Sequence, residues 1–173
     1  MALLADLLTG ARAVIAFGLV ASLATERLTT AGLLLSLAWL TDVFDGRFAR
    51  AAASPTRLGD RDLDVDTLVG AGVLVGLQLG ETVPIWITWG ALLILGVPYL
   101  ILKHPTLSMS MQAIAYALVL NLLWTEAGAV RWVPPLTILI ILVLDFERFR
   151  TITLPGFFSG FLRLLPERGE EDQ

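Results

Sequence analysis

Six of the sixteen acidic residues of the chain lie between Asp42 and Asp66, in a segment with apolar sequence on both sides. Asp42 and Asp45 are three positions apart and Asp62 and Asp66 are four, so each pair shares one face if its segment is helical. Unpaired carboxylates near hydrocarbon repel one another by roughly 4 kcal/mol per close pair at an effective dielectric constant near 20. A bound cation removes this cost. We therefore predict that these four carboxylates form an all-oxygen site for Mg²⁺ or Mn²⁺.

Small residues surround both pairs of carboxylates. Gly46 and Ala49 follow Asp42 at i+4 and i+7, while Gly59 and Gly70 flank the second pair. The gaps that they leave provide space for a bulky ligand such as a phosphate ester beside the metal site. The alternative is a solvated acidic loop with helix-capping Asp residues, which the agreement of spacing, glycines and apolar flanks disfavours.

The pattern D-x-x-D-G-x-x-A-R, eight residues, G, then two Asp four apart, resembles the signature of the CDP-alcohol phosphatidyltransferases. One interval differs: three residues usually separate the second glycine from the third Asp, whereas only Asp60 and Arg61 separate Gly59 from Asp62. Asp60 and Asp64 also have i,i+4 spacing. We assign the second pair to Asp62 and Asp66, because Asp60 follows Gly59 directly and leaves no turn to bring it onto the site.

This resemblance implies metal-dependent transfer of a phosphatidyl or related phosphoalcohol group from a CDP-linked donor, such as CDP-diacylglycerol, to an alcohol, with release of CMP, in phospholipid biosynthesis. The last Asp of the motif is the base in the family, a role that falls on Asp66, and two divalent ions would be held by Asp42, Asp45, Asp62 and Asp66. Gly46, Ala49 and Gly59 would admit the nucleotide, and Arg50 would pair with phosphate or brace an Asp.

The resemblance also implies a homodimer. Gly70, Gly72, Gly76, Gly90 and Gly96 in the third and fourth apolar segments would permit close helix association in lipid, although they could equally serve packing inside one subunit.

The segment Asp6-Leu-Leu-Thr9-Gly-Ala-Arg12 resembles the N-L-L-T-x-x-R opening that is common in the same family, with Asp where Asn is frequent. Thr9 and Arg12 would then meet a phosphate or headgroup near the site. Alternatively, Arg12 extends to the lipid headgroups as a snorkelling side chain.

With 56% hydrophobic residues and a mean hydropathy of +0.77, the chain is too apolar for a water-soluble domain. We predict an all-α membrane protein with a single domain over residues 1–173 and six transmembrane helices, each near the length that a bilayer requires. The predicted spans are residues 7–24, 30–48, 66–79, 83–102, 107–124 and 130–146. The third must extend upstream through Asp62 to reach spanning length. Pro98 with Gly96 should bend the fourth, and residues 155–165 should form an interfacial amphipathic helix.

Basic residues predict the orientation. With both termini in the cytoplasm, ten of the twelve Lys and Arg residues fall on the cytoplasmic side, and only Arg27 and Arg131 fall outside. The sequence therefore predicts a multi-pass protein of the cell membrane whose site faces the cytoplasm and meets a CDP-linked lipid, an alcohol acceptor and membrane lipids.

Other function classes receive little support. The chain has no cysteine, which excludes disulfides and thiolate chemistry, and it carries no nucleic-acid-binding motif. Two alternatives to the enzyme are a catalytically inactive family member that acts as a membrane scaffold and an ion transporter that uses intramembrane Asp residues. The clustering of the carboxylates at one membrane face argues against transport.

Overall fold

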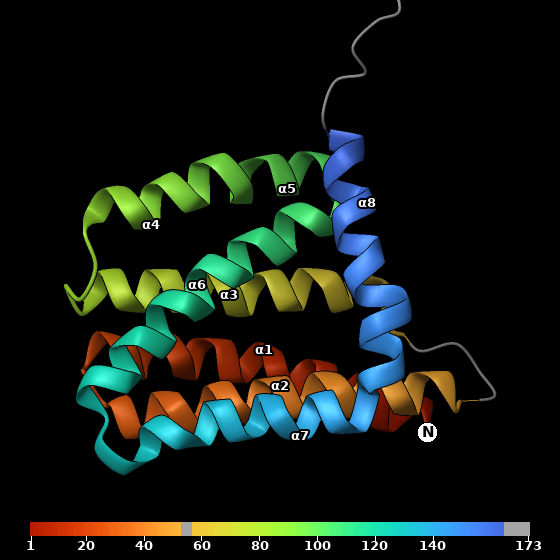
Figure 1. Cartoon of the computed structure of the whole chain (residues 1–173), viewed down its shortest axis with the longest axis horizontal. Coiled ribbons are helices and arrows are strands. Elements are labelled where there is room, and N and C mark those ends of the chain that lie inside the picture. Colours follow the sequence, from red (N-terminus) through yellow and green to blue (C-terminus); the bar gives the residue numbers. More distant parts are fainter. Residues whose placement is uncertain (53–56, 165–173) are drawn as a thin grey trace, which may run out of the picture.

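The computed structural model of the protein describes residues 1–52 and 57–164, which fold into helices without a strand. The longest helices are α1 (Ala2–Ala24), α2 (Leu28–Arg50), α3 (Asp62–Leu79), α6 (Pro105–Glu126) and α7 (Val133–Arg148). A further rod is continuous through α4 (Ile85–Ala91), the π-turn η2 (Leu92–Gly96) and α5 (Val97–Leu102). Short segments are η1 (Gly59–Arg61), η3 (Gly128–Trp132) and η4 (Phe149–Thr153), and α8 spans Leu154–Leu164. The rods lie roughly side by side, and α8 runs across them (Figure 1).

Within the described ranges, five helical segments are long and apolar enough to cross a membrane: Ala2–Ala24, Leu28–Arg50, Ile85–Leu102, Pro105–Glu126 and Gly128–Glu147. The predicted third span is also helical, and it begins upstream at Asp62 as expected. α3 carries three Asp residues, at positions 62, 64 and 66, and is therefore less apolar than the other five segments. That α3 completes a set of six spans is therefore a proposal, supported by its packing along α1.

Helices α1 and α3 pack against each other within the bundle. Gly72 and Gly76 lie at this contact, and a Cβ added at Gly76 would come within 2.9 Å of Leu23 Cβ and 3.1 Å of Val20 Cα. A Cβ at Gly70 would likewise come within 2.8 Å of Gln112 Cγ on α6. These three glycines therefore serve packing within the subunit, and they no longer support a dimer. Gly90, by contrast, faces open space.

The fourth rod departs from regular α-helix where Gly96 and Pro98 were expected to bend it. Its backbone forms the π-turn η2, which ends at Gly96, two residues before Pro98 in the first turn of α5. Proline lacks the N–H group that a continuous α-helix would use, and a π-turn is one way in which a helix accommodates this loss.

The predicted amphipathic segment is helical. α7 is interrupted at Asp145, whose φ of −126° and ψ of 26° are not helical, and the chain then continues through η4 into α8. α8 crosses the end of the bundle at which the N-terminus lies (Figure 1). This transverse course is the one expected for a helix lying at a membrane surface. Residue 165, the last of the predicted segment, is outside the described residues.

Candidate active site

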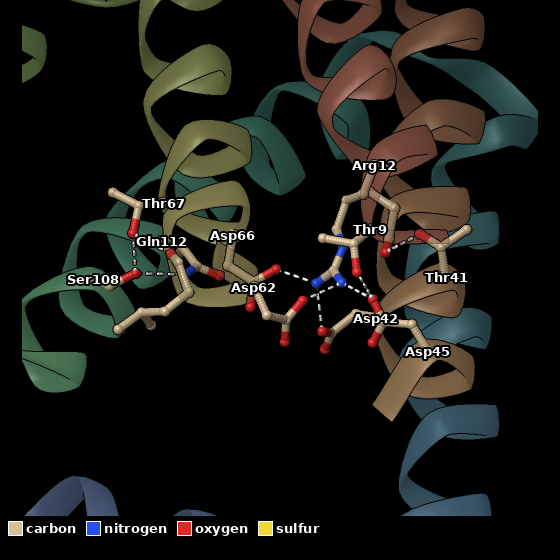
Figure 2. A network of polar contacts seen from close by, with 12 residues as sticks. Thr9, Arg12, Thr41, Asp42, Asp45, Asp62, Asp66, Thr67, Ser108 and Gln112 are labelled. Atoms are coloured by element: carbon tan, nitrogen blue, oxygen red, sulfur yellow. Dashed lines mark hydrogen bonds and ion pairs between the residues drawn. The ribbon is translucent and has the colours of Figure 1, made fainter. Parts of the chain in front are cut away.

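The four carboxylates of the predicted metal site converge at the end of the bundle near α8 and the N-terminus. Asp42 and Asp45 project from the last turns of α2, and Asp62 and Asp66 from the first turns of α3 (Figure 2). Carboxylate oxygens of Asp42, Asp62 and Asp66 lie within 4.8 Å of one another. Asp45 is the most buried of the four, with 3% of its surface exposed. The helical spacing seen in the sequence is thus what brings each pair onto one face.

Arg12 of α1 joins the two pairs. Helix α1 packs against both α2 and α3, and the Arg12 side chain, only 1% exposed, extends between them. Its guanidinium donates to Asp42 at 2.5 Å and Asp62 at 2.6 Å, and it also pairs with Asp45 and Asp66 (Figure 2). The interpretation that Arg12 snorkels to lipid headgroups is therefore wrong. The side chain bends inward, where the carboxylates of α2 and α3 offer it ionic partners.

Thr9, one turn before Arg12, contacts the same cluster. Its Oγ1 lies 3.1 Å from Asp45 Oδ2 and 3.2 Å from the carbonyl oxygen of Ala5. Asp6, on the preceding turn, accepts hydrogen bonds from the backbone N–H groups of Arg57 at 3.2 Å and Leu58 at 2.8 Å. The D-L-L-T-x-x-R segment therefore fixes both Asp45 and the backbone that leads into Gly59.

The short helix η1 precedes the second pair of carboxylates. It turns the chain between Gly59 and Asp62, so that Asp62 and Asp66 face Asp42 despite the shortened interval. Asp64 points elsewhere and accepts hydrogen bonds from Tyr99 Oη at 2.6 Å and Lys103 Nζ at 2.5 Å. The hydrogen bond to Asp64 raises the pKa of Lys103 above its ordinary value. Asp64 thus ties α3 to α5, a contact that the sequence did not indicate.

A second polar network supports the turn that carries Asp66. The hydroxyl groups of Thr67 and Ser108 lie 2.6 Å apart, and Gln112 Nε2 donates to Ser108 at 3.0 Å (Figure 2). Gln112 in turn accepts a hydrogen bond from Tyr116 Oη at 3.2 Å. These contacts join α3 to α6 directly behind Asp66 and restrict how far its backbone can move.

Two cavities larger than about 30 Å³ open beside the motif carboxylates. The smaller, of about 130 Å³, is lined by the three small residues that were expected to admit a nucleotide: Gly46, Ala49 and Gly59. Thr9, Asp45 and Asp62 also line it. Arg50 is not among its lining residues, and instead its Nη2 lies 4.0 Å from Asp145 Oδ2. The brace expected of Arg50 therefore involves an Asp outside the motif.

The larger cavity, of about 310 Å³, lies toward α6 and α7. All four motif carboxylates line it, together with Asp145 of α7. The sequence analysis missed Asp145, because an acidic residue at the end of the last apolar segment looks the same as an ordinary solvated charge. Asp145 is held by Arg47 at 3.5 Å, and Arg47 also donates to the carbonyl oxygen of Leu144 at 2.6 Å.

The donor set fits a hard divalent cation. The four carboxylates face a single guanidinium, which leaves three negative charges uncompensated within the cluster. Carboxylate oxygens are the ligands that Mg²⁺ and Mn²⁺ prefer. Asp42, Asp62 and Asp66 are close enough to share one ion. Asp45 is paired with the same Arg12 guanidinium as these three. These carboxylates could therefore hold a divalent cation.

Comparison with known proteins agrees with this geometry. Residues 2–144 match the family model described as CDP-alcohol phosphatidyltransferase. The match includes the four motif carboxylates, Arg12 and the small residues of the smaller cavity, and it ends one residue before Asp145. No curated protein and no solved structure matches the chain. Because the family model covers most of its length, the chain belongs to the CDP-alcohol phosphatidyltransferase family.

Proposed function

We propose that the protein transfers a phosphatidyl or related phosphoalcohol group from a CDP-linked donor, such as CDP-diacylglycerol, to an alcohol, and that it releases CMP. The observation that carries this proposal is the convergence of two carboxylate pairs from α2 and α3 beside the cavity lined by Gly46, Ala49 and Gly59. The proposed setting is the cell membrane, with the site facing the cytoplasm and the product entering phospholipid biosynthesis.

The chain's own residues supply most of the proposed mechanism. Asp42, Asp45, Asp62 and Asp66 would hold two Mg²⁺ or Mn²⁺ ions, whose positive charge, when bound, neutralises the donor pyrophosphate. The nucleotide would lie over the smaller cavity, where the absence of large side chains leaves room for it. Arg12, paired with all four carboxylates, keeps the α2 and α3 pairs at a fixed separation.

The transfer itself is a substitution at phosphorus. The acceptor oxygen forms a bond to the phosphorus nearer the donated group, while the bond from that phosphorus to the bridging oxygen breaks and CMP leaves with the electron pair. Asp66 takes the hydroxyl proton of the acceptor. It is suited to this role because it lines the larger cavity and is anchored from behind by the network of Thr67, Ser108 and Gln112.

Formation of CMP tests the proposal. Full-length protein in mild detergent, supplied with CDP-diacylglycerol, Mg²⁺ and a panel of alcohols, should release CMP with at least one acceptor, and mass spectrometry should find the matching phospholipid. Excess chelator should abolish release, and added Mg²⁺ or Mn²⁺ should restore it. CMP release that is unchanged by chelator would exclude the metal-dependent mechanism. No release with any acceptor would instead favour the inactive scaffold.

A further inference from the structure

We propose that the acceptor alcohol binds in the larger cavity without a phosphate or other anionic group, and that Asp145 sets this preference. This inference rests on the proposed function and adds the chemical class of the second substrate. Asp145 lies outside the segment that matches the family model, so its role does not follow from membership of the family.

The position of the acceptor follows from the arrangement of the two cavities. Both are lined by Asp45, Gly46 and Asp62, so they meet at the carboxylates from different sides. In phosphoryl transfer the attacking and leaving oxygens lie roughly in line through the phosphorus. If CMP leaves on the side of the smaller cavity, the acceptor must approach from the larger one. Its volume of about 310 Å³ is that of a small-molecule site.

The charge of the larger cavity disfavours an anionic acceptor. Five carboxylates line it, and its described lining includes no Lys, Arg or His side chain. Two divalent ions and Arg12, together with Arg47 and Arg50 at Asp145, would bring about seven positive charges against these five, and the two negative charges of the donor pyrophosphate would then leave the loaded site about neutral. A phosphate monoester on the acceptor would add about 1.5 to 2 further negative charges at neutral pH.

In the described part of the chain, four basic side chains near the site have carboxylate partners. Arg12 is shared by the four motif residues, and Lys103 is bound to Asp64. Arg47 and Arg50 pair with Asp145 at 3.5 and 4.0 Å. An acceptor phosphate that binds one of these four cations would compete with its carboxylate, whereas an uncharged hydroxyl or an ammonium group would not.

The remaining walls suit an alcohol with a short carbon skeleton. Met109 of α6 and Ile141, Leu142 and Phe149 of α7 and η4 provide apolar surface, and Thr153 provides a hydroxyl group. The interruption of α7 at Asp145 places a carboxylate at this otherwise apolar wall. Asp145 can accept a hydrogen bond from a second hydroxyl of the acceptor, or pair with an ammonium group.

Matched acceptors test the preference. With CDP-diacylglycerol and Mg²⁺ held constant, kcat/KM is measured for glycerol and for glycerol 3-phosphate. Phosphoethanolamine, which has no free hydroxyl group and cannot react as an acceptor, is tested only as a competitive inhibitor of the reaction with ethanolamine. We expect glycerol to exceed glycerol 3-phosphate by about tenfold or more, which corresponds to 1.4 kcal/mol of transition-state binding. A preference for glycerol 3-phosphate would overturn the inference and leave the proposed function intact. Absence of CMP release with every acceptor would overturn both.

Variants then test Asp145 itself. Asp145→Asn should raise kcat/KM for glycerol 3-phosphate by about tenfold through a lower KM, without a matching rise for glycerol, while the KM of CDP-diacylglycerol stays within about twofold. Arg47→Gln is the matched control, because it removes one of the ion-pair partners of Asp145 and leaves the carboxylate in the cavity wall. If Arg47→Gln produces the same change as Asp145→Asn, or if Asp145→Asn alters both acceptors equally, Asp145 acts only by holding the end of α7 and the proposed selectivity is wrong.

Discussion

Asp62 and Asp64 are two residues apart on the same helix, yet they have different partners. Asp62 lies with Asp42 and Arg12, whereas Asp64 binds Tyr99 and Lys103. This divergence follows from helical geometry, in which positions separated by two residues do not share a face. It provides a pair of variants that differ little in chemistry and strongly in location.

We expect Asp62→Asn to lower the rate of CMP release by at least about a hundredfold, as when one group that stabilises transition-state charge is removed from an active site. Asp64→Asn, the matched control, should change the rate by less than about threefold, since its contacts are to α5. The rates are compared at saturating Mg²⁺ after normalisation to folded protein. The reverse result, with Asp64 essential and Asp62 dispensable, would move the second metal-binding pair to Asp60 and Asp64.

Arg12 supplies the guanidinium that four carboxylates share, so its removal should leave the repulsion between these carboxylates uncompensated. Breaking a buried ionic cluster typically costs 3–5 kcal/mol, and we expect about 1–3 kcal/mol for Arg12→Gln because Asp42, Asp62 and Asp66 reach solvent. In chelator, the melting temperature of Arg12→Gln should therefore fall below that of the native protein.

Added Mg²⁺ provides the sharper measurement. The carboxylates should bind it more tightly without Arg12, and stabilisation by a ligand grows with its concentration relative to its Kd. Mg²⁺ should thus raise the melting temperature of Arg12→Gln more than that of the native protein. Arg27→Gln, at the opposite end of the bundle, controls for loss of a charge alone. Equal Mg²⁺ shifts in all three proteins would show that Arg12 and the ion do not share these carboxylates.

At the scale of the helices, the sequence predicted most of what positions the site. The carboxylate pairs and small residues could be identified because each pair depends on spacing within one helix. Asp145 could not, because its place beside Asp42 depends on how α7 packs against α2 and on the interruption of α7. The direction of the Arg12 side chain could not be predicted for the same reason. Whether it extends to the lipid headgroups or to the carboxylates depends on the packing of α1 between two other helices.

The end of α2 also sets the size of the smaller cavity. Ala49 lies there with Gly46 and Gly59, and a larger side chain would enter the 130 Å³ that we assign to the nucleotide. Ala49→Leu should weaken CMP binding by about tenfold or more, a typical penalty for a misfitting group in a pocket, without loss of the helical circular dichroism signal. Ala51→Leu is the matched control, because Ala51 is exposed just beyond α2. Unchanged CMP affinity in Ala49→Leu would place the nucleotide elsewhere.

At the scale of the whole molecule, the number of membrane crossings depends on α3. Its first turns carry the carboxylates of the site, and its glycines are used for packing against α1. If α3 spans, η1 and the turn after Leu79 must lie on opposite sides of the membrane. Lys and Arg residues then gather at the site end, and Arg27 and Arg131 lie at the other, as cytoplasmic orientation of the site requires.

The absence of native cysteine allows this to be measured with single cysteine residues. Asp60→Cys and Glu81→Cys place a thiol at exposed positions before and after α3. In intact cells, a membrane-impermeant maleimide should label Glu81→Cys and not Asp60→Cys, and permeabilisation should expose Asp60→Cys. A charged reagent does not cross the lipid bilayer to the cytoplasmic side, whereas it can reach the turn after α3 on the outer side. Labelling of both variants in intact cells would mean that α3 does not cross the membrane, and labelling of Asp60→Cys alone would mean that the site faces outward.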